Sequence, residues 1–155
     1  MIEIYAGNTL IQTIKKVMSA SVRETLEGEL TLSLTVLARS ALALKVRQIA
    51  KLGNQYFEIV QLSKNLQGSL PVCSIMCEHV SYKLNEEKYE IENFNFTGNP
   101  TTGLSQLLSG TPFQAGTVAY TGSVTMKINQ VVTRRAALMQ YIAIIGGEIE
   151  YDGIK

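Results

Sequence analysis

The chain has 155 residues, of which 46% are hydrophobic and 17% are charged, and its net charge at neutral pH is +1. This length allows one or two domains with a real core, and the small net charge excludes a polybasic surface as the main basis for binding nucleic acid. The chain has one His and one Asp, which excludes a metal site built from several histidines. A Ser–His–Asp catalytic triad could be formed only from this one His and this one Asp.

The first half of the chain is patterned as β-strands. Apolar and polar side chains alternate over residues 29–36, which predicts a strand with one buried and one wet face. Residues 18–23 alternate in the same way, and the Glu27-Gly28 pair between them predicts a hairpin turn, because glycine accepts a positive φ. The wet face of the later strand is polar and rich in hydroxyl groups, and it consists of Glu29, Thr31, Ser33 and Thr35.

Two further hairpins are predicted in this half. One turns at residues 52–54 and joins strands over 44–51 and 55–62, and the other turns at 65–69 and leads into a strand over 72–84. Five to seven strands packed this closely favour a small antiparallel barrel or sandwich. Residues 1–85 carry nine Lys or Arg and six Glu, a net +3, and residues 86–155 carry a net −2. We therefore expect a β-barrel-like domain over 1–85 and a smaller α+β domain over 86–155.

The second half changes character. Residues 99–102 predict a turn and a helix N-cap, followed by a helix that ends before Gly110, and residues 117–128 return to strand patterning. Thr133 caps a predicted helix that runs to Ile145 and stops at the Gly146-Gly147 pair, and residues 148–151 begin a strand. Arg134 and Arg135 lie at the N-terminal end of this helix, where the helix dipole disfavours cations. The apolar residues of this helix cover more than one face, which predicts that it is buried on several sides or lies at an interface. The candidate interface residues are Leu138, Tyr141, Ile142 and Ile145.

Few residues offer chemistry. His79 shares a strand face with Cys77, but neither lies on a loop or at a helix N-terminus, so a structural histidine is the favoured interpretation over a catalytic pair. The acidic segment 86–92 lacks the Asp and Gly of a calcium loop, and residues 109–113 lack the ending of a phosphate loop. We therefore expect no enzyme activity, no metal and no cofactor. The aromatic residues Tyr89, Phe94 and Phe96 favour core packing, with a sugar-stacking surface as the alternative.

Several segments in order resemble one known family: RETLEGELTLSLTV (23–36), GNQYFEIVQ (53–61), CEHVSYKL (77–84), LSQLLSGTPFQAG (104–116) and AALMQYIAIIGGEIEYDG (136–153). They are similar to the N-terminal region of phage minor structural proteins, also called the prophage endopeptidase tail family. These are tail-tip or baseplate-hub proteins, often called tail-associated lysins. The resemblance covers nearly the whole chain.

The resemblance implies a homotrimer at the end of the tail tube, in which barrel-like domains from three subunits form a ring. The ring docks on the distal tail protein, and DNA and the tape-measure protein pass through its lumen. Family members continue with a second barrel, so we expect a truncated chain or an assembly completed by another chain, and endopeptidase activity is not carried over. We expect a virion tail-tip location, no membrane span, and Glu29, Thr31, Ser33 and Thr35 at the lumen or an interface. A cell-wall carbohydrate-binding module is the alternative function.

Overall fold

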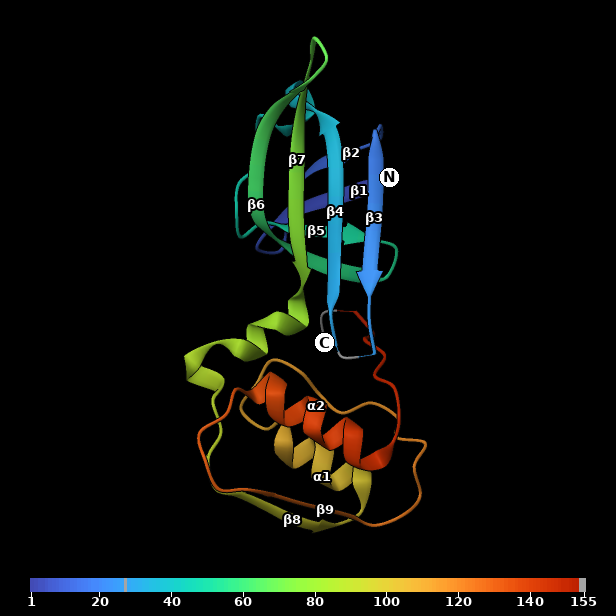
Figure 1. Ribbon diagram of the computed structural model, residues 1–155, viewed down its shortest axis with the longest axis vertical. Coiled ribbons are helices and arrows are strands. Elements are labelled where there is room, and N and C mark those ends of the chain that lie inside the picture. The colour runs from blue at the N-terminus through green and yellow to red at the C-terminus, as the bar shows by residue number, and fades with distance from the viewer. Residues whose placement is uncertain (27, 154–155) are drawn as a thin grey trace. The chain divides into compact units, whose positions relative to one another are not determined.

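The computed structural model describes residues 1–26 and 28–153, so the predicted turn residue Glu27 lies outside the described residues. The chain divides into two compact units, Met1–Val80 and Ser81–Lys155 (Figure 1). Whether each unit folds as a separate domain stays a prediction. In the part of the chain that the structure describes, no helix has both the length and the apolar character needed to cross a membrane.

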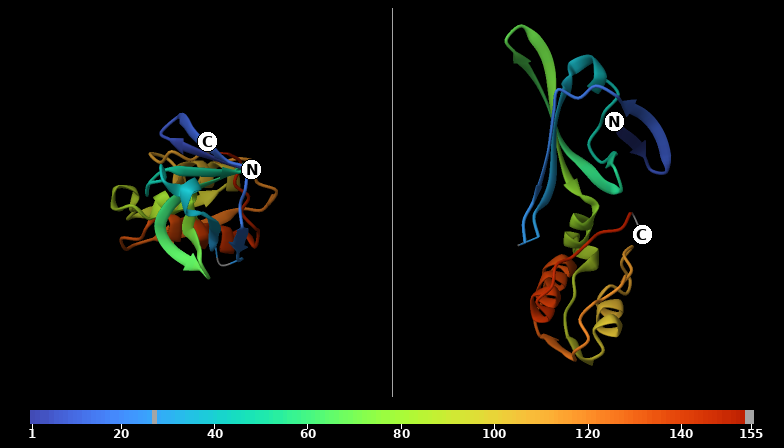
Figure 2. Two further views of the ribbon diagram at one scale, coloured as in Figure 1. Left: turned by 90° about the horizontal axis from the view of Figure 1, so that it is seen from above. Right: turned by 90° about the vertical axis from the view of Figure 1, so that its right-hand side faces the viewer.

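The first unit is one antiparallel sheet of seven strands in the order β2-β1-β5-β6-β7-β4-β3. In Figure 1 the strands β1, β2 and β5 run across β3, β4 and β7 and lie behind them, and the side view of Figure 2 shows the same strong curl. The predicted mainly β, α+β fold with a barrel-like sheet is therefore confirmed as a curled half-barrel. The strands are β1 (Ile2–Ala6), β2 (Thr9–Ile14), β3 (Ser19–Glu24), β4 (Leu30–Leu37), β5 (Ile49–Leu52), β6 (Gln55–Gln67) and β7 (Leu70–His79).

The core of this unit fills the inside of the curl. Strand β4 buries every second side chain, as its alternating pattern predicted, and the same face of β7 is buried beside it. The other wall comes from β1, β5 and β6. The fully or nearly fully buried side chains include Ile2, Ile4, Leu32, Leu34, Val36, Ala50, Phe57, Ile59, Cys73, Ile75 and Cys77.

The first two predicted hairpins are confirmed, with one boundary corrected. Strands β3 and β4 pair antiparallel, and β5 and β6 turn through Gly53, whose φ of +60° is one that glycine adopts without strain. Residues 44–48 were wrongly predicted as strand. Arg47 has a φ of 72°, which interrupts an extended chain, and its N–H donates to the carbonyl of Ile59.

The third predicted hairpin is also confirmed, but its far arm is shorter than expected. Strand β7 ends at His79, and residues Val80–Asn85 form a 3-10 helix instead of more strand. The burial of Val80, Ser81 and Leu84 explains the difference, because this spacing fits a helical turn and not the alternation of a strand. A second 3-10 turn, Glu87–Tyr89, follows.

The second unit contains a two-stranded antiparallel sheet, β8 (Phe94–Gly98) and β9 (Val124–Ile128), with helices α1 (Pro100–Leu107) and α2 (Arg134–Ile145). Helix α2 begins and ends as predicted, whereas α1 already begins at Pro100, inside the predicted turn, and has its C-cap at Leu108, one residue earlier than predicted. The Asn99 side chain accepts hydrogen bonds from the N–H groups of Thr101 and Thr102, and Thr133 caps α2 through the N–H of Ala136. Gly146 ends α2 in the left-handed conformation, with a φ of 68°.

Two strand predictions in this unit are wrong. Residues 117–123 and 148–151 belong to no sheet. Strand β8 pairs with residues 124–128 and then gives way to Asn99 and helix α1. Residues 117–123 would need a continuation of β8 as their partner, and the chain is helical there. An alternating pattern without a neighbouring strand to pair with does not form a sheet ladder.

Candidate functional surface

The predicted polar face of β4 continues across neighbouring strands. In the pairing register, Ser33 lies opposite Ser21 of β3, and Thr35 lies opposite Ser19 of β3 and Ser74 of β7. Ser74 in turn lies opposite Ser63 of β6. Partners in register share a face of the sheet, so these side chains form one outward surface. We call it the hydroxyl face, after its side chains Ser19, Ser21, Thr31, Ser33, Thr35, Ser63 and Ser74. Met76 and Glu78 of β7 share this face, opposite Ser33 and Thr31.

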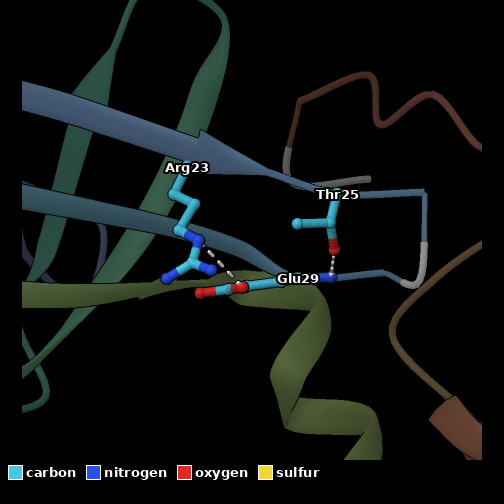
Figure 3. A network of polar contacts seen from close by, with 3 residues as sticks. All are labelled: Arg23, Thr25 and Glu29. Carbon is cyan, nitrogen blue, oxygen red and sulfur yellow. Dashed lines mark hydrogen bonds and ion pairs between the residues drawn. The ribbon is translucent and has the colours of Figure 1, made fainter.

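Glu29 lies at one end of this face and is paired with a cation. Its carboxylate is 3.2 Å from Nε of Arg23, and its N–H donates to Oγ1 of Thr25 at 3.1 Å (Figure 3). The Arg23 and Glu29 side chains are 73% and 37% exposed, so water screens the pair and its contribution to stability is small. The ion pair therefore offsets the positive charge of Arg23 at the end of the hydroxyl face.

The four residues named on α2 lie inward. Leu138 and Tyr141 are buried in the core of the second unit, and Ile142 and Ile145 pack against that core while partly buried. The Tyr141 hydroxyl donates to the carbonyl of Pro100, and burial raises its pKa. These contacts account for the strongly apolar sequence of the helix, and a further role at a subunit interface stays a prediction.

Arg134 has a role that the sequence did not reveal. Its guanidinium donates to the carbonyl of Tyr89 at 2.9 Å, to the carbonyl of Leu107 and to the carbonyl of Ser109 at 3.3 Å. Leu107 and Ser109 lie at the C-terminal end of α1, where carbonyls lack partners within the helix and the helix dipole favours a cation. The unfavourable position at the start of α2 is thus offset by a favourable one at the end of α1.

The candidate Cys–His pair lies in the core of the first unit. His79 is 1% exposed, and its ring meets the ring of Phe57 edge-on with centroids 5.6 Å apart. Burial raises the pKa of the Cys77 thiol to about 12, so the thiol stays protonated at neutral pH and is a poor nucleophile. Both observations favour the structural interpretation of His79.

The aromatic residues considered for sugar stacking are partly buried. Phe94 packs against the core of the second unit, and the Phe96 ring lies directly against Gly103 of α1. Tyr89 has the ammonium of Lys88 4.8 Å from its ring centroid. No observation favours the carbohydrate-binding alternative, which stays a prediction. Among residues 1–26 and 28–153, no group of three or more His, Cys, Asp or Glu side chains is placed to hold a metal ion.

A cavity of about 990 Å³ in the second unit was not predicted. Its floor is apolar and includes Leu104, Leu108, Leu138 and Ile142, and its walls are the irregular segments 113–120 and 147–152. Both segments that were wrongly predicted as strands contribute to these walls. A strand pattern in a segment that has no sheet partner was therefore the signal in the sequence for this cavity.

Comparison with known proteins gives a fold and no family. No protein-family model matches the chain, and no curated protein matches it. Among solved structures, the chain is similar to the prophage tail protein gp18 from Listeria monocytogenes EGD-e, with a TM-score of 0.69 and 14% sequence identity. The match covers 98% of this chain and 48% of that protein, so the chain spans about half the length of the structure it matches. At this identity the likeness establishes a shared fold.

Proposed function

We propose that the chain is a structural component of a phage or prophage tail. The observation that carries the proposal is the fold likeness to a prophage tail protein, which extends over nearly all of this chain, across both compact units. The ordered segments that resemble phage minor structural proteins support the same role independently of the fold. Because shared fold alone does not imply shared function, the role requires a direct test.

The more specific form of the proposal is a tail-tip or baseplate hub. In it, three copies form a ring that extends the tail tube, docks on the distal tail protein, and lets DNA and the tape-measure protein pass. The hydroxyl face fits the lumen wall of such a ring. Lysine and arginine bind DNA by displacing counterions from phosphates, and a wall of Ser and Thr hydroxyls offers no such gain. Arg23, the cation at the end of this face, is paired with Glu29.

The proposed role is non-catalytic. It is supported by the buried position of His79 and by the raised pKa of Cys77, which remove the one catalytic pair that the sequence suggested. The chain would then serve the tail by its shape and its contacts with neighbouring subunits.

Light scattering coupled to size exclusion, together with negative-stain electron microscopy of the same fractions, tests the hub proposal. The expected result is a mass near three times 17.0 kDa and ring-shaped particles with an open centre. A single mass of 17.0 kDa at every concentration, with no rings, would contradict a ring formed by this chain. As a surface control, Ser33→Ala on the hydroxyl face should leave the mass unchanged if that face lines a lumen and is not a subunit contact.

A further inference from the structure

The cavity of the second unit combines an apolar floor with a rim of one charge sign. The charged residues in its lining are all acidic, and they are Glu148, Glu150 and Asp152. These three side chains are exposed, while Ile149 and Tyr151 between them are half-buried. The rim therefore presents negative charge to solvent around an apolar interior, which fits a partner that is both apolar and cationic.

The cavity is large enough for side chains from another molecule. Its volume of about 990 Å³ is at the upper end of the range for pockets that enclose a small ligand. Its walls at 113–120 and 147–152 are irregular segments that belong to no sheet or helix. A short loop with one or two aliphatic side chains is an occupant of suitable size.

A loop of matching chemistry lies in the first unit, between the 3-10 turn Ala38–Ala41 and strand β5. Its side chains Leu42 and Val46 are 75% and 53% exposed, and Lys45 and Arg47 beside them are exposed cations. The Arg47 side chain is 80% exposed and has one distant ion pair, 3.9 Å from the carboxylate of Glu58. Arg47 also holds a positive φ of 72°, a conformation that is costly for a residue with a side chain and is often associated with function. We call residues 42–47 the cationic loop.

We propose that the cationic loop of one copy docks in the acidic-rimmed cavity of a second copy. Leu42 and Val46 enter the apolar interior, and Lys45 and Arg47 meet Glu148, Glu150 and Asp152. The contact joins two different surfaces, so repetition of it produces a closed ring or an open filament. This inference rests on the proposed function, in which copies of the chain assemble into a ring, and it names the surfaces that meet.

Two charge-reversed variants of the full chain test the contact. The loop variant is Lys45→Glu with Arg47→Glu, and the rim variant is Glu148→Lys with Glu150→Lys. In each variant alone, loop and rim carry like charges, so the dissociation constant for self-association should weaken by at least about tenfold. Combined in one chain, the four substitutions restore opposite charges on loop and rim at every contact, so the mass of the wild-type assembly should return. Sedimentation equilibrium at low and high salt measures all three samples.

Matched controls separate this contact from a general effect of charge. Lys15→Glu with Lys16→Glu alters two exposed cations elsewhere in the first unit, and Glu87→Lys with Glu90→Lys alters two exposed acids outside the cavity. Both controls should assemble like the wild type. Equal weakening in the controls, or no recovery when the four substitutions are combined in one chain, would overturn the docking of loop in cavity.

The same samples, imaged by electron microscopy, distinguish the two proposals. Ring-shaped wild-type particles that persist in both charge-reversed variants would overturn the loop contact and leave the hub intact. Charge-dependent assembly into open filaments would support the contact and contradict the ring. A wild-type chain that stays monomeric would overturn the contact between copies.

Discussion

Gly103 of α1 occupies a position where the structure leaves no room for a side chain. A Cβ atom built on Gly103 would lie 2.6 Å from a ring carbon of Phe96 and 2.6 Å from the Tyr141 hydroxyl. Neither neighbour moves freely, because Phe96 belongs to β8 and the Tyr141 hydroxyl is held by the carbonyl of Pro100 in a fully buried position. Gly103→Ala therefore forces the helix away from the sheet or breaks the Tyr141 hydrogen bond.

The expected magnitude combines opposing contributions. Alanine favours a helix over glycine by about 1 kcal/mol. Overpacking a core costs about 1–3 kcal/mol, and a buried polar group that loses its partner costs about 1–3 kcal/mol. The balance is a loss of about 1–5 kcal/mol in the free energy of unfolding of the second unit. That is a substantial part of the stability of a typical domain.

Urea unfolding, with hydrogen exchange of the α1 and α2 amides to report on the second unit, measures the effect. Gly116→Ala is the matched control, since its added Cβ meets nothing within 4 Å and its stability should change by less than about 0.5 kcal/mol. Tyr141→Phe removes one of the two crowding groups. The double variant should therefore lose less stability than the sum of the losses in Gly103→Ala and Tyr141→Phe alone. A Gly103→Ala chain as stable as the wild type, or more stable, would refute this account of the packing.

Three further predictions concern single side chains. Arg134→Lys should destabilise the second unit by about 2 kcal/mol in urea unfolding, because an ammonium cannot reproduce the guanidinium's contacts with separate carbonyls; an unchanged midpoint would contradict this role. Cys77 should resist iodoacetamide in the folded protein up to at least pH 9 and react after unfolding, because its pKa is near 12; rapid labelling of the native thiol would show that it is accessible. Glu3 accepts a hydrogen bond from the Tyr5 hydroxyl at 2.8 Å, which lowers the Glu3 pKa below 4.5, and Lys51 lowers it further. Its stabilising effect should be present above pH 4.5 and fade as the pH falls through the lowered pKa, and carbon-detected NMR titration should show Tyr5→Phe raising that pKa.

The elements that were predicted correctly are those with local signals in the sequence. Asn99 and Thr133 cap their helices with their own side chains, and Gly146 ends α2 in a conformation that glycine favours. The alternation in β4 identified the polar face because a side-chain period of two is a property of the strand itself. Such features depend on a few neighbouring residues and can be read from a single sequence.

The missed features depend on the partners that each segment meets. Residues 117–123 carry a strand pattern but have no neighbouring strand, and Val80–Asn85 turns where a continuous strand was expected. The extent of the hydroxyl face could not be predicted from the sequence either. A register shift between Ile59 and Gln61 places Ser63 opposite Ser74, and the sequence gives no signal for that shift. The contacts of Arg134 and the cavity likewise join segments that are distant along the chain.

The proposed function requires that this chain is built into a phage or prophage tail. Its most direct test is gold-labelled antibody against the chain, imaged on particles released after induction of the strain that encodes it. Label should be confined to one end of the tail, and mass spectrometry should detect the chain in the purified particles. Purified tails that contain no trace of the chain and bind no label would contradict it.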